Sequence, residues 1–179
     1  MSETYEEQYW KDRRSMESKH MLQVISWAEF FQPTSVFDFG CGTGEYLHVW
    51  EDLGVKIRGY DVSEYACKHA YGRARGSCFP VLEAPEKHDL VTCYDVMEHL
   101  TEAQVDEMLL RIKERASKWI LFSICMAGDP NYMYDPTHVL QRSRKWWGEK
   151  LAKHFDVYDA PPGFLYAQQL LMCRVRDEK

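Results

Sequence analysis

Several features are scarce or absent in this sequence of 179 residues, and each absence argues against one class of protein. No run of about 18 consecutive apolar residues occurs, so a membrane-spanning helix is not expected. Residues 1–19 are dense in charge and lack the apolar core of a signal peptide, from which we expect a soluble, cytoplasmic protein. The net charge is −6 and no block of Lys and Arg is present, which does not favour nucleic acid or a membrane as a partner.

Paired cysteines are absent as well. The six cysteines are scattered and form no Cys-x-x-Cys motif of the kind that zinc sites and redox sites use. We therefore expect small, reduced, mostly buried side chains at these positions: Cys41, Cys67, Cys78, Cys93, Cys125 and Cys173. No repeat or low-complexity segment occurs, and the length suits one domain spanning 1–179.

The most informative stretch is a glycine loop between a strand and a helix. The largely apolar residues 36–39 predict a buried strand, and Gly40, Gly42 and Gly44 follow it. The segment that follows repeats apolar residues at helical spacing, so we expect a helix that ends at Gly54 and buries Tyr46, Val49, Trp50 and Leu53. The pattern differs from the Gly-x-Gly-x-x-Gly of dinucleotide enzymes and lacks the Gly-Lys-Ser/Thr of a P-loop.

Two acids flank this loop. Asp38 stands two residues before the first glycine, where a carboxylate suits a ligand with an ammonium group and repels a pyrophosphate. Asp61 follows a second predicted strand, residues 55–60, and an acceptor-only side chain there can bind both hydroxyls of a ribose. An amino-acid-bearing nucleoside cofactor therefore fits better than a nicotinamide dinucleotide.

The sequence Asp38-x-Gly40-x-Gly42-x-Gly44 resembles the first motif of the class I S-adenosylmethionine-dependent methyltransferases. The resemblance implies an α/β fold, the Rossmann-like class I methyltransferase fold: a mostly parallel seven-stranded sheet with an antiparallel C-terminal hairpin and helices on both faces. By the same resemblance the glycine loop wraps the methionine part of S-adenosylmethionine, Asp61 binds its ribose and Val62 packs on its adenine.

Two further cofactor residues follow from this resemblance. Residues 78–82 are a candidate third strand, and Glu83 comes after it where the family often places an acid that binds the adenine amino group. Residues 89–94 predict a fourth strand, whose last residue, Tyr94, we expect beside the methionine part of the cofactor.

The fourth strand is followed by Asp95-x-x-Glu98-His99. This sequence resembles a metal-binding motif of ubiquinone-pathway O-methyltransferases and of small-RNA 2′-O-methyltransferases, and in the RNA group a later histidine, here His138, completes the site. Asp95, Glu98, His99 and His138 could hold Mg²⁺, Mn²⁺ or Fe²⁺. Because Glu-His-Leu after this strand is also common in metal-free relatives, a divalent metal is not favoured.

Without a metal, His99 and His138 are candidate catalytic bases. Methyl transfer requires the acceptor to lie close to the methyl group and to lose its proton, and histidine suits that task near neutral pH. An amine acceptor could need positioning alone, and each histidine could instead be structural. Residues 125–142 contain tyrosines and prolines and form a candidate substrate lid, and residues 1–20, with Tyr9 and Trp10, could close the cofactor site.

The remaining elements are ordinary amphipathic ones. We expect a helix before Pro33 that buries Met21, Val24, Ile25, Ala28 and Phe31. Thr101-x-x-Gln104 predicts a capping box, followed by a helix that buries Val105, Met108, Leu109 and Ile112. A fifth strand at 119–124, a helix capped by Ser143 that buries Trp147, Leu151 and Phe155, and strands at 155–159 and 166–175 complete the chain.

Together these observations favour a methyltransferase that uses S-adenosylmethionine and methylates oxygen or nitrogen of a small molecule. Two alternatives stay open. One is a metal-dependent RNA 2′-O-methyltransferase, and the other is a catalytically silent, methyltransferase-like binding subunit. The glycine spacing opposes a nicotinamide oxidoreductase. The sequence does not predict the oligomeric state.

Overall fold

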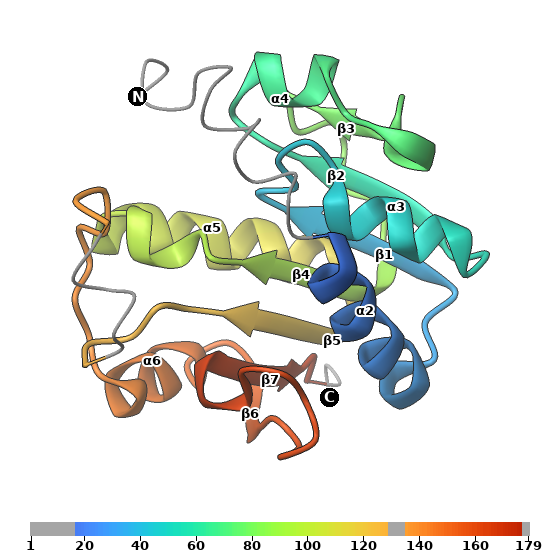
Figure 1. Cartoon of the computed structure of the whole chain (residues 1–179). Coiled ribbons are helices and arrows are strands. Elements are labelled where there is room, and N and C mark those ends of the chain that lie inside the picture. Colours follow the sequence, from blue (N-terminus) through green and yellow to red (C-terminus); the bar gives the residue numbers. More distant parts are fainter. Residues whose placement is uncertain (1–16, 129–134, 177–179) are drawn as a thin grey trace. The chain divides into compact units, whose positions relative to one another are not determined.

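The computed structural model describes residues 17–128 and 135–176, which Figure 1 draws as a coloured ribbon. The chain divides into two compact units, Met1–Ala84 and Pro85–Lys179. The first unit contains α2 (Glu17–Phe31), β1 (Ser35–Phe39), α3 (Glu45–Asp52), β2 (Lys56–Tyr60), α4 (Glu64–Lys68), the 3₁₀ turn η2 (Gly72–Ala74) and β3 (Cys78–Phe79). The second contains β4 (His88–Tyr94), the 3₁₀ turn η3 (Met97–His99), α5 (Glu102–Arg115), β5 (Ala116–Ser123), α6 (Arg144–Leu151), β6 (Asp156–Asp159), the 3₁₀ turn η5 (Ala167–Gln169) and β7 (Leu170–Arg174).

The strands of the first unit are parallel and have the order β3-β2-β1. The residues of β1 from Val36 to Phe39 are buried without alternation, as expected of a parallel strand with both faces covered. Helix α3 packs on β1 and β2, where Leu47 joins a buried cluster with Cys41, Ala70, Ala74 and Cys78. The glycine loop thus lies between two packed elements.

Two helices of the first unit bury a face that agrees with the prediction only in part: Val24, Phe31 and Trp50 are buried as predicted. Among residues 21–31 of α2 the buried side chains are those of Gln23, Val24, Trp27 and Phe31, whereas Met21 and Ile25 are 48% and 38% exposed. The reason is Trp27, whose ring stacks on Tyr46 of α3 with 5.5 Å between centroids. In α3 the fully buried side chains are Leu47 and Trp50, and Leu53, which follows the last turn, is exposed.

The prediction of a strand over 78–82 is wrong in length. Strand β3 contains Cys78 and Phe79 alone, and Pro80 follows directly. The last hydrogen bond from β2 to β3 runs from Asp61 N to Phe79 O at 3.2 Å, and the residues after Pro80 form no strand. Glu83 therefore lies in an exposed connection.

The strands of the second unit have the order β4-β5-β7-β6, parallel between β4 and β5 and antiparallel in the other two pairs. The capping box at Thr101 and Gln104 is confirmed, and Val105, Leu109 and Ile112 of α5 are fully buried. The cap of α6 is also confirmed, because Ser143 Oγ accepts a hydrogen bond from Trp146 N. Trp147, Leu151 and Phe155 are buried as predicted.

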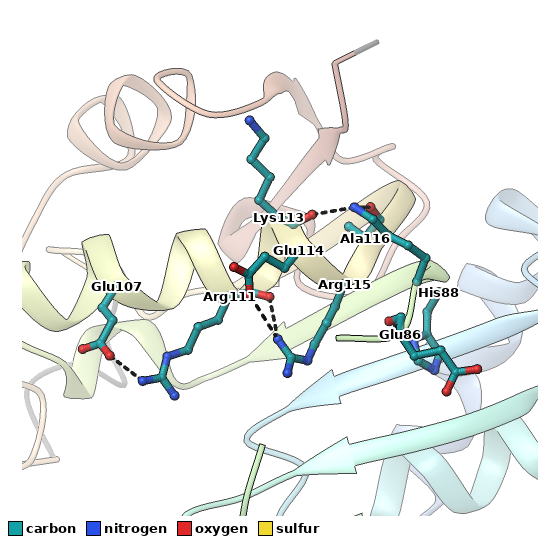
Figure 2. A network of polar contacts seen from close by, with 9 residues as sticks. Glu86, His88, Glu107, Arg111, Lys113, Glu114, Arg115 and Ala116 are labelled. Carbon is teal, nitrogen blue, oxygen red and sulfur yellow. Dashed lines mark hydrogen bonds and ion pairs between the residues drawn. The ribbon is translucent and has the colours of Figure 1, made fainter. Parts of the chain in front are cut away.

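Polar contacts fix the junction between α5 and β5, as Figure 2 shows. Lys87 Nζ donates hydrogen bonds to the carbonyl oxygens of Lys113 and Ala116, at 2.9 and 3.0 Å. Arg115, whose side chain is buried, donates to Arg111 O at 3.2 Å and lies 3.7 Å from a carboxylate oxygen of Glu114. The bond to Lys113 O satisfies a carbonyl group of the last turn of α5 that lacks an i+4 partner within the helix.

The predicted fold class is confirmed. Among the described residues, seven strands form a mostly parallel sheet with an antiparallel hairpin of β6 and β7, and helices pack on its strands. All six cysteines are free thiols, and five are buried. Within residues 17–128 and 135–176, no helix has the length and apolar character that crossing a bilayer requires.

Candidate active site

The glycine loop leaves β1 and enters α3 through backbone conformations that favour glycine. Gly40, Gly42 and Gly44 have φ values of 77°, 54° and 81°. Gly44 is also crowded, because a Cβ atom added to it would lie 2.5 Å from the Cβ of Ala74. Gly40 N and Cys41 N both donate to Tyr60 O, at 2.7 and 3.1 Å, so the loop is fastened to the end of β2.

Asp61 makes a second connection between the loop and β2. This carboxylate is buried; its Oδ2 accepts from Gly42 N at 2.9 Å and its Oδ1 from Ser63 N at 2.8 Å. Burial raises the pKa of Asp61, and the hydrogen bonds from Ser63 and Gly42 offset part of that rise. Each carboxylate oxygen can accept a further hydrogen bond, so Asp61 can hold the loop and bind a ligand hydroxyl together. Sequence reasoning did not foresee the bond to Gly42.

The other predicted cofactor residues of the first unit differ in exposure. Asp38 is buried within β1, and Val62 is 64% exposed directly after Asp61. Glu83 forms an exposed ion pair with Arg58, whose guanidinium lies 4.6 Å from the ring centroid of Phe79. Glu83 thus already accepts from a cation through Oε2.

In the second unit, β4 ends at the half-buried Tyr94 and the backbone then turns sharply at Asp95. Asp95 has a φ of 53°, which is unusual for a residue other than glycine. Its N–H donates to Ser123 O at 3.0 Å, and its Oδ1 accepts from Ser123 Oγ at 2.7 Å. Residues held in such a conformation by their surroundings are concentrated at functional sites.

Glu98 joins three segments of the second unit from a fully buried position. Its Oε1 accepts from Cys125 N at 2.8 Å, and its carbonyl oxygen accepts from Val139 N and Leu140 N at 2.9 and 3.0 Å. Burial, together with the charge of Asp95, raises the pKa of Glu98 to about 8. Glu98 therefore carries a proton at neutral pH and positions the segment that contains His138.

His99 and His138 come together as the candidate bases of one cluster. Their rings pack edge to face, with 4.6 Å between centroids. His99 Nδ1 lies 2.8 Å from Thr137 Oγ1, which donates in turn to Asp135 Oδ1, and His138 Nε2 lies 3.6 Å from Asp135 Oδ2. Sequence reasoning assigned no role to Asp135 or Thr137, although Asp-x-Thr is a common sequence for a local turn in which aspartate accepts from a backbone N–H two residues later.

The donor atoms of a metal site are arranged differently from the prediction. In the part of the chain that the structure describes, two groups of side chains have donor atoms within 4.8 Å of one another: Glu98 with Cys125 and His138, and His99 with Asp135 and His138. Asp95 belongs to neither group. Two imidazoles and a carboxylate suit a divalent transition metal, so the second group is the one whose chemistry could hold such an ion.

The two predicted closing segments are described only in part. Tyr9 and Trp10 lie outside the described residues, as do Asn131 to Tyr134 of the candidate lid. The described ends of the lid are held close together, because Ala127 N donates to Arg142 O at 2.9 Å. The roles of residues 1–20 and 125–142 therefore stay predictions.

Comparison with known proteins relates this architecture to one family. The sequence model of the family described as "Methyltransferase domain" matches residues 9–161. A curated relative, the ubiquinone biosynthesis O-methyltransferase of Thiobacillus denitrificans, is 24% identical over 142 residues, which cover 70% of this chain and 61% of that protein. The chain thus spans about three fifths of the length of this relative.

Solved structures share the fold at low sequence identity. The magnesium protoporphyrin IX methyltransferase of Synechocystis, crystallised with bound S-adenosylmethionine, has a TM-score of 0.67 at 21% identity, over 93% of this chain and 83% of that chain. A S-adenosylmethionine-dependent methyltransferase from Archaeoglobus fulgidus has a TM-score of 0.67 at 16% identity, over 88% of this chain and 94% of that chain.

Proposed function

This chain belongs to the methyltransferase-domain family, and from that membership we propose that it transfers a methyl group from S-adenosylmethionine to an oxygen or nitrogen atom of a small molecule. One observation carries the proposal: Asp61, a buried carboxylate, accepts from Gly42 of the glycine loop and retains lone pairs for a ligand. The names of the relatives, an O-methyltransferase of ubiquinone biosynthesis and a porphyrin methyltransferase, support a small acceptor.

The residues of the first unit suit the parts of this cofactor. The positive-φ glycines Gly40, Gly42 and Gly44 leave backbone without side chains for the methionine part, and Asp38 supplies a negative charge for its ammonium group. Asp61 would bind the ribose hydroxyls. Contact with adenine would remove the exposed apolar surface of Val62 from water, which favours binding. Glu83 for the adenine amino group and Tyr94 for the methionine part remain proposals by family resemblance.

The bound cofactor supplies an electrophilic methyl group on a sulfonium centre. For a hydroxyl acceptor, the task that remains for the protein is to hold the oxygen and remove its proton. We assign the proton to an imidazole nitrogen of His99 or His138, the two titratable side chains that pack ring against ring beside Asp135. Neutral histidine can accept such a proton near pH 7, and Asp135 is placed to stabilise the resulting charge.

A metal-assisted reaction is the second candidate, because His99, Asp135 and His138 place two nitrogen donors and one oxygen donor together. In that case the residues would bind the ion, and the ion would lower the pKa of a coordinated acceptor hydroxyl. Methylation of RNA 2′-hydroxyls belongs to this candidate. It predicts activity that a chelator abolishes.

The experiment that tests the function measures formation of S-adenosylhomocysteine from S-adenosylmethionine with a panel of small phenols, catechols and amines and with short RNA. The proposal is supported if a small acceptor is methylated, if EDTA leaves the rate unchanged and if His99→Gln lowers it. Turnover of RNA that EDTA abolishes supports the metal-dependent alternative. Tight cofactor binding without turnover of any acceptor would contradict the enzymatic proposal and indicate a silent binding subunit.

A further inference from the structure

The described part of the candidate lid contains His138 and two further residues, Asp135 and Thr137, that contact the histidine pair. Thr137 Oγ1 lies 2.8 Å from His99 Nδ1 and donates a hydrogen bond to Asp135 Oδ1. The two loop residues are thereby connected to a histidine that lies 38 positions before Thr137 in the chain. We propose that Thr137 and Asp135 are positioning residues that hold His99 in the tautomer with a proton on Nδ1 and a lone pair on Nε2. This inference deepens the proposed function, on which its catalytic part rests.

The direction of the hydrogen bonds follows from counting protons. An ionised carboxylate only accepts, and Asp135 Oδ1 faces both the N–H of Thr137, at 2.9 Å, and its hydroxyl. Its Oδ2 faces His138 Nε2 at 3.6 Å, so both oxygens of Asp135 are placed as the acceptors of an ionised carboxylate. The threonine hydroxyl has one proton, and the carboxylate is the stronger acceptor.

Because Thr137 gives its proton to Asp135, its oxygen can only accept from His99. The proton between them therefore belongs to His99 Nδ1, and the lone pair of the neutral ring is on Nε2. When Nε2 takes a proton from an acceptor hydroxyl, the new positive charge lies one hydroxyl group away from the Asp135 carboxylate. A catalytic base of this kind needs both the correct tautomer and a stabilising charge behind it.

The other groups near this relay are His138 and Glu98. His138 Nε2 lies 3.6 Å from Asp135 Oδ2, so the carboxylate uses one oxygen toward each histidine. Glu98 holds the loop through its carbonyl oxygen, which accepts from Val139 N and Leu140 N. Since these backbone bonds do not involve the threonine hydroxyl, Thr137→Val should remove the relay without releasing the loop.

The test reads the tautomer directly. Long-range ¹H–¹⁵N spectra distinguish protonated from unprotonated imidazole nitrogens, and the His99 signals are assigned as those lost in His99→Gln. We expect neutral His99 to carry its proton on Nδ1 in the wild type and in Thr137→Ser, and to shift toward the Nε2–H tautomer in Thr137→Val. Thr34→Val is the matched control, because Thr34 is exposed and belongs to the other compact unit.

An Nε2–H tautomer in the wild type, or an unchanged His99 in Thr137→Val, would overturn the inference. This readout needs no acceptor, so it stands even if the proposed function fails. Once an acceptor is found, Thr137→Val should lower kcat about tenfold with little change in KM. A general base contributes roughly 10²- to 10⁴-fold to the rate, and loss of its positioning should remove only part of that factor. Recovery in Thr137→Ser is expected, and equal losses in both variants would contradict the positioning role.

Discussion

Replacing Gly44 by alanine tests whether the glycine loop is shaped by steric necessity. The residue has a φ of 81°, and the new Cβ would lie 2.5 Å from Ala74 Cβ and 3.2 Å from Cys78 Sγ. The left-handed backbone costs a residue with a side chain about 1–2 kcal/mol. Overpacking against the buried cluster adds about 1–3 kcal/mol. We therefore expect Gly44→Ala to lower the free energy of unfolding by about 2–5 kcal/mol, a large share of the stability of a typical domain.

Gly54 provides the matched control. Its φ is 79°, nearly that of Gly44, but nothing lies within 4 Å of an added Cβ. Gly54→Ala should therefore lower the free energy of unfolding through the left-handed backbone conformation alone. The reduced conformational entropy of the unfolded chain affects both variants alike. The difference between the two variants isolates the steric contribution, about 1–3 kcal/mol.

Urea unfolding followed by circular dichroism measures both variants, with an unchanged m-value as the condition for comparing midpoints. Adding Ala74→Gly to Gly44→Ala removes the shortest contact, so the double mutant should recover about 0.5–3 kcal/mol relative to additivity. Equal destabilisation of Gly44→Ala and Gly54→Ala, or strict additivity with Ala74→Gly, would refute the reasoning.

Three other predictions concern buried and capping groups. Glu98 has a pKa raised to about 8 in the folded protein, so the folded state binds the extra proton and stability should fall as pH rises from about 4.5 to about 8. Glu98→Gln should flatten that dependence, as thermal unfolding against pH would show, and an unchanged slope would contradict the assignment. Thr101→Ala should cost about 1 kcal/mol by removing the capping box of α5, and Thr101→Ser should restore most of it in urea unfolding. In Asp61→Asn the amide cannot accept from both Gly42 N and Ser63 N, so affinity for S-adenosylhomocysteine should fall at least about tenfold.

Local patterns predicted most of the fold. Glycine spacing located the turn from β1 to α3, and the Thr101 and Gln104 pair located the start of α5, because such signals act over a few residues. The predicted buried face of α2 was right at Val24 and Phe31 but wrong at Met21 and Ile25, because Trp27 packs on Tyr46 of another helix and turns its own side inward. Strand β3 ends directly before Pro80, and a proline within a run of residues argues against a regular strand, so its length could have been read from the sequence.

The candidate site was predictable in residue type but not in arrangement. His99 and His138 were expected in one region, and their rings do pack together. The partners Asp135 and Thr137 were missed because the bond from Thr137 to His99 spans 38 positions and depends on the path of the lid segment. Asp95 was grouped with the metal ligands by its motif, which stays a prediction, and its hydrogen bonds to Ser123 at the end of β5 were not foreseen.

The most direct test of the central claim is calorimetric titration of the purified chain with S-adenosylhomocysteine and, separately, with NADH. We predict saturable binding of S-adenosylhomocysteine that Asp61→Asn weakens and that Asp156→Asn, which alters an exposed ion pair with Arg176, leaves unchanged. No binding of S-adenosylhomocysteine by the folded wild type, or binding of NADH in its place, would contradict the assignment of this chain as a S-adenosylmethionine-dependent enzyme.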